Sequence, residues 1–177
     1  GFAEATGRYT IFFDADDIVH PSAIETGIPL LDSTGADTAI FPYRYERGNS
    51  STSNAMNKED TNVWREYARS SQAPHRVVKL TKSPRLLLMS AYPWNKVVRT
   101  EHFARHRLRF GSTPVHNDIL GHWHSLLFAK SILLVDSEIC THIMDGSGSN
   151  LSNRRDAVRM TIFDALDETY DLLQRHP

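Results

Sequence analysis

Three acidic residues follow an apolar stretch near the start of the chain. Residues 9–13 are aromatic or β-branched, a composition typical of a buried strand, and Asp14, Asp16 and Asp17 come directly after them. Side chains alternate along a strand, so Asp14 and Asp16 would point to the same side. Two carboxylates can share one hard cation, and Mg²⁺ or Mn²⁺ held in this way usually also binds substrate phosphates. The pattern therefore predicts a metal–phosphate site where a strand leaves a sheet.

A simpler interpretation of Asp17 is also open. Acidic residues often cap the start of a helix, and Asp17 lies shortly before Pro21, which suits a first helical turn. Three acids within four positions favour the metal site over this capping role.

Composition limits the possible classes of protein. The chain has 177 residues, which suits one domain, and 40% of them are hydrophobic, which is enough for a core. The 20 basic and 21 acidic residues nearly balance, so we expect no nucleic-acid partner. The single cysteine, Cys140, is typical of a reducing compartment, and we expect a cytoplasmic protein. No apolar stretch approaches the roughly 20 residues of a membrane-spanning helix, so we expect no transmembrane segment.

Strands and helices are expected to alternate along the chain. Apolar or β-branched stretches predict strands over residues 9–13, 38–45, 132–135 and 138–144. Apolar residues at helical spacing predict helices that start near Pro21 and that cover residues 101–107, 118–130 and 155–174. The polar stretch 47–62 is expected to be a loop. This alternation indicates an α/β fold.

Several segments together carry a longer pattern. Ala5-Thr6-Gly7-Arg8-Tyr9 precedes the acidic turn, and Pro21 follows it. The later segments are Pro93-Trp94-Asn95-Lys96-Val97-Val98-Arg99, Leu108-Arg109-Phe110 and His116-Asn117-Asp118. In this order they resemble the DxD region, the Trp-x-Lys-x-x-Arg segment, the Leu-Arg-Phe segment and the Glu-Asp turn of family 2 glycosyltransferases. Asn117 replaces the usual Glu of that family.

The resemblance covers most of residues 1–152 and implies a fold. A partial GT-A fold is expected, which is Rossmann-like, is found in nucleotide-diphospho-sugar transferases, and has a mixed sheet flanked by helices. Residues 1–152 would form the C-terminal portion of the catalytic domain, and residues 153–177 would form a terminal helix packed on it. The nucleotide-binding part of the family, roughly 60–100 residues, would precede Gly1, so this stretch alone is expected to be inactive.

The resemblance also implies an activity. It is the metal-dependent, inverting transfer of a sugar from a nucleotide-diphospho sugar to a hydroxyl of a glycan or another acceptor, as in cell-surface polysaccharide biosynthesis. Asp118 would be the general base that takes the proton of the acceptor. Asp16 and Asp14, with His142 nearby, would hold Mn²⁺ or Mg²⁺. The residues expected to contact the donor are Asp14, Asp17, Trp94, Lys96, Ser147 and Ser149. For the full-length protein, the resemblance is compatible with peripheral association with a membrane.

Two other functions stay open. Residues 14–18 also resemble motif I of haloacid-dehalogenase phosphatases, with Asp14 as the nucleophile and Ile18 where those enzymes have Thr or Val. The segment from Trp94 to Arg99 favours the glycosyltransferase. The second alternative is a non-catalytic interaction domain of the same fold, and Asn117 is the hint for it.

Some of these residues have purely structural interpretations. Asp118 suits the N-cap of the predicted helix 118–130, and Trp94 suits the core. Lys96 could simply be solvated, and a Gly/Ser loop over residues 146–149 needs no ligand.

Three histidines lie around the expected base, at positions 116, 122 and 124. His122 and His124 would lie on different faces of a helix, which is a poor arrangement for one ion. We therefore expect these histidines at the surface or lining the acceptor site.

Overall fold

The computed structural model describes residues 2–47, 54–68, 73–144 and 156–175. Its centre is a five-stranded mixed sheet with the strand order β1-β7-β3-β8-β6. These strands span Tyr9–Thr10 (β1), Lys96–Arg99 (β7), Thr38–Ile40 (β3), Ile132–Val135 (β8) and His75–Val78 (β6). β3 and β8 run parallel, and the other neighbouring pairs run antiparallel.

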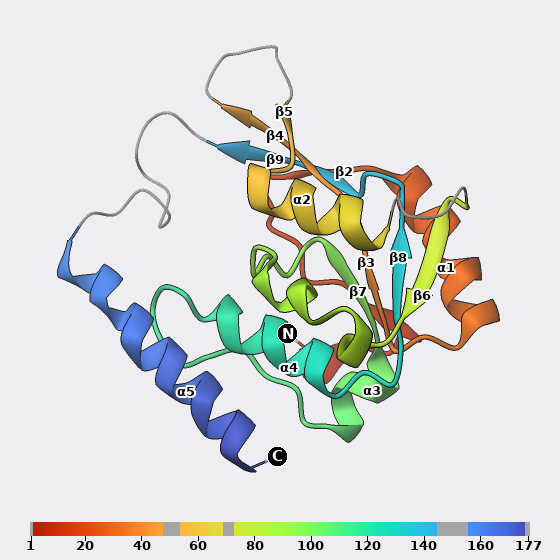
Figure 1. Ribbon diagram of the computed structural model, residues 1–177. Coiled ribbons are helices and arrows are strands. Elements are labelled where there is room, and N and C mark those ends of the chain that lie inside the picture. The colour runs from red at the N-terminus through yellow and green to blue at the C-terminus, as the bar shows by residue number, and fades with distance from the viewer. Residues whose placement is uncertain (1, 48–53, 69–72, 145–155, 176–177) are drawn as a thin grey trace.

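A second sheet of four strands continues two strands of the first. Its order is β2-β9-β4-β5, with spans Ile18–Val19 (β2), Cys140–Met144 (β9), Arg44–Arg47 (β4) and Asn54–Ala55 (β5). Along the chain, β3 leads into β4 and β8 leads into β9. β3 pairs with β8 in the first sheet and β4 pairs with β9 in the second, both in parallel, so the same two stretches of chain lie side by side in both sheets (Figure 1). β2 pairs with β9 through Ile18 and Thr141, which brings the acidic turn next to β9.

Helices cover both faces of the central sheet because successive side chains of a strand point to opposite faces. The face toward α1 (Pro21–Thr34) holds Ala39, Leu133 and Val135. The opposite face packs against α2 (Lys58–Tyr67), the 3₁₀ helix η3 (Pro84–Leu88) and α4 (Asp118–Leu127), and it holds Ile40, Ile132 and Leu134. This arrangement confirms the predicted α/β fold with a mixed sheet flanked by helices.

The remaining helices lie at the margins of this core. α3 (Thr100–Arg105) follows β7 directly, and α5 (Ile162–Arg175) packs alongside α4 on the outside of the molecule (Figure 1). Short 3₁₀ helices span Phe2–Glu4 (η1), Leu80–Lys82 (η2) and Ala157–Thr161 (η5).

Several predicted elements have different bounds. The predicted strand 38–45 is divided between β3 and β4, and Pro42, which has no N–H for a sheet ladder, lies in the break. The strand predicted over 9–13 pairs only at Tyr9 and Thr10, and the helix predicted over 118–130 ends at Leu127. The helix predicted over 155–174 consists of η5 followed by α5.

The prediction of a loop over residues 47–62 is wrong for its second half. Residues 54–55 form β5, and α2 begins at Lys58. The Asn57 side chain caps α2 by accepting a hydrogen bond from the Asp60 N–H at 2.9 Å. Residues 48–53 lie outside the described part of the chain.

Candidate functional site

The three carboxylates of the acidic turn lie in two different environments. A hydrogen bond of 3.3 Å from the Asp17 N–H to the Asp14 carbonyl closes the turn. The residues Asp14 and Asp16 are exposed, whereas the Asp17 side chain is 0% exposed. Burial, and then the charges of Asp17 and Asp16, raise the pKa of the Asp14 carboxyl. The turn therefore presents two crowded carboxylates to solvent and turns the third inward.

Asp17 joins the acidic turn to β9. Its Oδ1 accepts hydrogen bonds from the Ile143 N–H at 2.9 Å and from the His142 ring at Nδ1 at 2.8 Å. The alternative interpretation, that Asp17 caps the helix at Pro21, is wrong, because His20 is the N-cap of α1 and provides no side-chain cap. The β2–β9 pairing places the Asp17 carboxylate against β9 instead.

His142 was expected beside the metal or the diphosphate. Its Nδ1 faces Asp17, so a metal ion would have to bind through Nε2. The ring stacks on Trp94 at a centroid distance of 5.2 Å and an angle of 24°. Two contacts thus fix the orientation of this imidazole.

Trp94 lies at the centre of an aromatic cluster made of Tyr43, Tyr92, Trp94 and His142. Its indole stacks on Tyr92 at 4.4 Å, and the ring of Tyr43 meets it edge-on at 5.0 Å. The residue is only 1% exposed. The structure therefore places Trp94 in the core, where it supports His142, as the structural interpretation expects.

The aromatic cluster is hydrogen-bonded to polar groups at the start of α2, among them the buried Asp60, that the sequence interpretation missed. The Tyr43 hydroxyl donates to Asp60 at 2.7 Å, and the Ser90 N–H donates to the same carboxylate at 2.8 Å. Asn57 donates to the Tyr43 hydroxyl at 3.0 Å. The signal in the sequence was the spacing of Asn57 and Asp60, which is typical of a capped helix start.

Asp118 is the first residue of α4. Asn117 is the N-cap, with no side-chain hydrogen bond, so the interpretation of Asp118 as the N-cap is wrong. The pKa of the Asp118 carboxyl is raised to about 6, by burial first and then by the charge of Asp14, while the charge of Lys96 acts to lower it. The electrostatic influence of Asp14 means that the fold brings the two ends of the predicted site together.

Three residues hold α4 against the stretch that leads to the acidic turn. The rings of Phe12 and Phe110 meet edge-on, with centroids 4.9 Å apart. Phe110 in turn lies on Gly121, where an added Cβ would be 2.6 Å from the ring. Because Gly121 has no side chain, the first turns of α4 can approach Phe110, which places Asp118 near Asp14.

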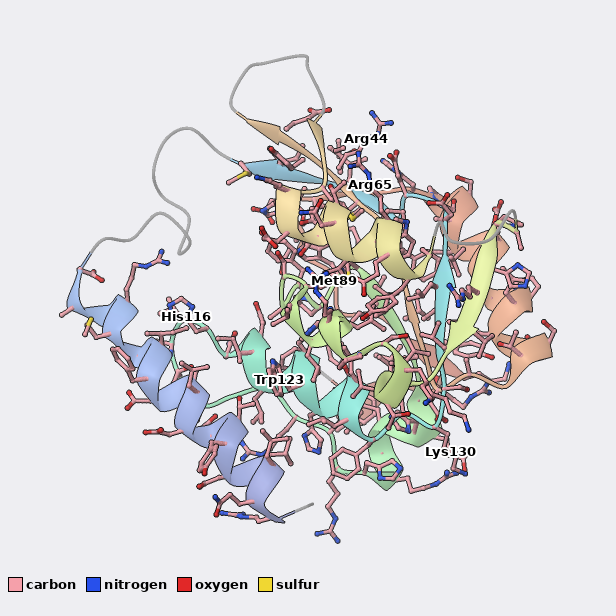
Figure 2. All side chains as sticks on the ribbon, viewed as in Figure 1. Arg44, Arg65, Met89, His116, Trp123 and Lys130 are labelled. Carbon is pink, nitrogen blue, oxygen red and sulfur yellow. The ribbon has the colours of Figure 1, made fainter. Side chains whose placement is uncertain are left out.

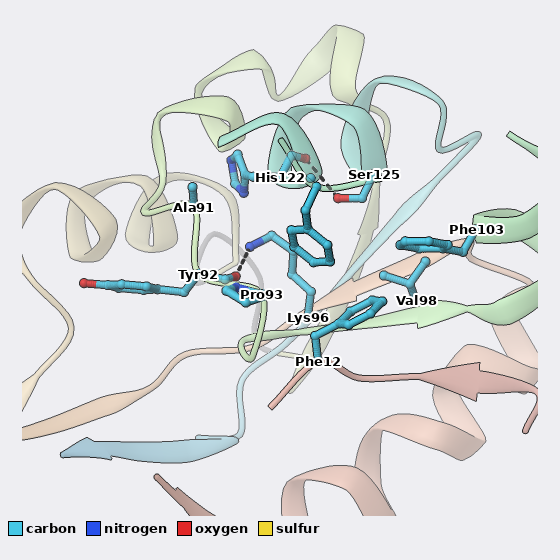
Figure 3. Close-up of a pocket in the computed structure, with 11 residues that line it drawn as sticks. Phe12, Ala91, Tyr92, Pro93, Lys96, Val98, Phe103, His122 and Ser125 are labelled. Carbon is cyan, nitrogen blue, oxygen red and sulfur yellow. Dashed lines mark hydrogen bonds between the residues drawn. The ribbon is translucent and has the colours of Figure 1, made fainter. Parts of the chain in front are cut away.

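Lys96 is buried beneath this site. It is 4% exposed, and its ammonium donates to the Tyr92 carbonyl at 2.6 Å and to Asn95 Oδ1 at 2.7 Å. Figure 3 shows it in a small apolar hollow with Phe12 and His122. Burial lowers the pKa of Lys96 to about 7. The interpretation of Lys96 as a solvated side chain is wrong, and the predicted phosphate contact stays a prediction.

The histidines around Asp118 are mostly internal. His122 and His124 are 2% and 5% exposed, and His122 Nε2 lies 3.2 Å from the Leu86 carbonyl. The expected surface position is therefore wrong for both: His122 packs against η3, and the buried ring of His124 lies 5.0 Å from that of Phe128. The alternative, that they line the acceptor site, stays a prediction. His116 lies on the loop before α4, beside α5, with a positive φ of 67° (Figure 2).

Ser147 and Ser149 lie outside the described residues, so their predicted contact with the donor stays a prediction. Among the residues that the structure describes, no group of three or more histidine, cysteine, aspartate or glutamate side chains is arranged to hold a metal ion. No helix in the described ranges is long and apolar enough to span a membrane.

Comparisons with known proteins give a family and a similar fold. Residues 1–104 match the family described as Glycosyl transferase family 2. Among solved structures, S. aureus TarS 1-349 in complex with UDP-GlcNAc is similar, with a TM-score of 0.65 and 16% identity over 88% of this chain and 40% of that chain. TarS 1-349 in complex with UDP is similar with a TM-score of 0.60 and 16% identity over 81% of this chain and 38% of that chain. A comparison with curated proteins gives no match.

The two sheets and their helices define a GT-A-like α/β domain of the kind found in glycosyltransferases. The family match covers more than half of the sequence, and the chain belongs to glycosyl transferase family 2. The chain spans about two fifths of the length of the TarS chains it resembles. Family membership favours sugar transfer over the phosphatase alternative.

Proposed function

We propose that this chain carries the acceptor side of a metal-dependent, inverting glycosyltransferase. The enzyme moves a sugar from a nucleotide-diphospho sugar to an acceptor hydroxyl. The observation that carries the proposal is the closeness of Asp118 to Asp14 of the acidic turn, whose charge contributes to the raised pKa of Asp118, in a chain that belongs to glycosyl transferase family 2.

Asp118 is the general base in this proposal. A base works best when its pKa lies near the working pH, because it is then ionised yet still accepts a proton readily. Burial and the nearby Asp14 raise the pKa of Asp118 to about 6, which meets this condition at neutral pH. The carboxylate takes the proton of the acceptor hydroxyl as the oxygen attacks the anomeric carbon and the nucleotide diphosphate leaves. Direct displacement inverts the configuration at that carbon.

The acidic turn fits a hard divalent cation. Asp14 and Asp16 are exposed carboxylates on one short turn, and their mutual repulsion contributes to the raised pKa of Asp14. They provide two protein ligands, which is the usual number for Mg²⁺ that also binds substrate phosphates. Bound there, Mn²⁺ or Mg²⁺ supplies positive charge for the leaving diphosphate. Asp17 holds the turn on β9 and does not need to bind the ion itself.

UDP-GlcNAc is the first donor to test, because TarS structures in complex with UDP-GlcNAc and with UDP are among the similar folds. The assay uses the full-length protein with radiolabelled donor, with and without Mn²⁺. The Asp118→Asn variant is expected to lose transfer by a factor of about 10² or more while keeping donor affinity. NMR of the product reports whether the configuration is inverted.

The matched control is Asp164→Asn, which makes the same change at an exposed acid of α5. It is expected to keep wild-type transfer. Undiminished turnover by Asp118→Asn would contradict the assignment of the base. Donor binding without any turnover of the wild-type protein, across donors and acceptors, would favour the non-catalytic alternative.

A further inference from the structure

A side chain of α5 holds the loop that leads to Asp118. The Glu168 carboxylate accepts hydrogen bonds from the Ser112 N–H at 3.1 Å (Oε2) and 3.3 Å (Oε1), and the Ser112 hydroxyl donates to Oε1 as well. These hydrogen bonds lower the pKa of Glu168, so it is ionised at neutral pH. Hydrogen bonds to an ionised acceptor are stronger than neutral ones.

Glu168 lies on the side of α5 that packs on α4. Its neighbours Ala165 and Thr169 are both buried there, and Figure 1 shows α5 running alongside α4 and the loop before it. We call the hydrogen bonds between Glu168 and Ser112 the clamp. The clamp ties the loop before α4 to α5, which already packs on α4, and so limits how far the loop can move away from α5.

The clamped loop is closed on itself and ends at the proposed base. The Gly111 N–H donates to the Asn117 carbonyl at 2.8 Å, which joins the two ends of residues 111–117. Asp118 follows at once. A Cβ at Gly111 would lie 2.9 Å from Glu168 Oε2 and 3.3 Å from the Asn117 backbone. Glu168 thus lies against the start of the loop, at Gly111 and Ser112, next to the hydrogen bond that closes it.

We propose that Glu168 is a positioning residue for sugar transfer: from α5 it fixes the loop 111–117 and thereby the place of the Asp118 carboxylate at the acceptor. This role rests on the proposed function of Asp118. Glu168 itself touches no reacting atom. Its contribution is to keep the base within reach of the acceptor hydroxyl, where misplacement by about 1 Å is enough to slow a reaction strongly.

The test uses Glu168→Ala and Glu168→Gln in the full-length protein, with Asp167→Ala as the matched control at an exposed acid one residue away on α5. Hydrogen exchange measures the amides of residues 111–117, and steady-state kinetics measures transfer. Glu168→Ala is expected to exchange these amides about tenfold faster, and the control is expected to leave them unchanged.

In the same variants, kcat is expected to fall about 10- to 100-fold in Glu168→Ala while the donor KM changes less than about twofold. Glu168→Gln keeps an acceptor oxygen for Ser112 and is expected to restore most of both readouts. If Glu168→Ala does not fold, Ser112→Ala removes the hydroxyl contact alone, and a smaller change in the same direction is expected.

Distinct outcomes separate this proposal from the proposed function. Unchanged exchange in Glu168→Ala overturns the clamp, and faster exchange with an unchanged kcat overturns the positioning role. A third outcome is faster exchange in Glu168→Ala together with no sugar transfer by the wild type. It confirms the clamp but overturns the assignment of Asp118, and the positioning role with it.

Discussion

The imidazole of His142 lies 2.8 Å from the carboxylate of Asp17, although the two residues are 125 positions apart in the sequence. The same carboxylate also accepts a hydrogen bond from the Ile143 N–H. Asp17 is thus the residue that joins the acidic turn to β9, while its neighbours Asp14 and Asp16 face solvent. Within one short turn, the structure separates a structural acid from two candidate metal ligands.

Asp17→Ala should destabilise the fold, and Asp16→Ala should not. Removing the Asp17 carboxylate leaves the half-buried Ile143 N–H without its acceptor, at a cost of about 1–3 kcal/mol in the free energy of unfolding. Asp16 is exposed, so its removal should change stability by less than about 0.5 kcal/mol while it abolishes metal-dependent transfer. Urea denaturation and the transfer assay measure the two effects. Equal stability losses in both variants would contradict the separation of roles.

The rate of transfer should follow the ionisation of Asp118. The base acts as a carboxylate, and its pKa is about 6, so kcat should rise about tenfold per pH unit below pH 6 and level off above it. The Asp164→Asn control should keep the same profile. A limb centred near pH 4, where an ordinary aspartate titrates, would show that Asp118 is not the group observed.

Asp118→Asn should stabilise the protein at high pH although it removes activity. The folded-state pKa of about 6 lies above the ordinary 3.8, so folding favours the protonated form. The penalty is absent below about pH 3.8, develops as the pH rises to about 6 and is complete above it. The asparagine removes this penalty. The difference in unfolding free energy between the variant and the wild type should therefore be about 3 kcal/mol more favourable to the variant at pH 8 than at pH 3.

Urea denaturation of both proteins at the two pH values measures this gain, with Asp164→Asn as the control that should show none. A pH-independent difference between Asp118→Asn and the wild type would contradict the raised pKa.

Gly121→Ala should destabilise the contact between α4 and Phe110. The new Cβ would lie 2.6 Å from the Phe110 ring, and such overpacking costs about 1–3 kcal/mol, which outweighs the gain in helix propensity of up to about 1 kcal/mol. The smaller side chain in Phe110→Leu makes room, so the double variant should be less destabilised than the sum of the two single variants. Strict additivity in urea denaturation would show that Gly121 does not need to lack a side chain.

Much of the fold could be predicted because local patterns and global structure agree. The apolar run at Ile132–Val135 forms the buried strand β8, and the helix that starts at Pro21 is α1. The prediction of a loop failed over residues 54–62, where β5 and the first half of α2 lie. α2 buries Val63 and Trp64, but its mean composition is polar, and one buried face is a weak signal in a short helix.

The candidate site was predicted in its residue types and only partly in its arrangement. The run Asp14-Ala15-Asp16-Asp17 indicated a carboxylate cluster, and strand alternation grouped Asp14 with Asp16, yet nothing in the run showed that Asp17 turns inward to bind β9. That distinction depends on the pairing of β2 with β9, which joins residues far apart in the chain. Likewise, His122 and Lys96 are polar residues that the sequence placed toward solvent or ligand, and the packing of α4 on the sheet buries both.

The sequence by itself determined which groups can do chemistry, because carboxylates at the end of an apolar stretch and an acid at a helix start are local features. It also indicated the family, through motifs in a fixed order. The tertiary structure decided which of these groups meet. The Phe12–Phe110–Gly121 contact brings Asp118 toward Asp14, and burial in that packed environment raises the pKa of Asp118 to about 6. Long-range contacts and desolvation are properties of the folded chain, so no local pattern could supply them.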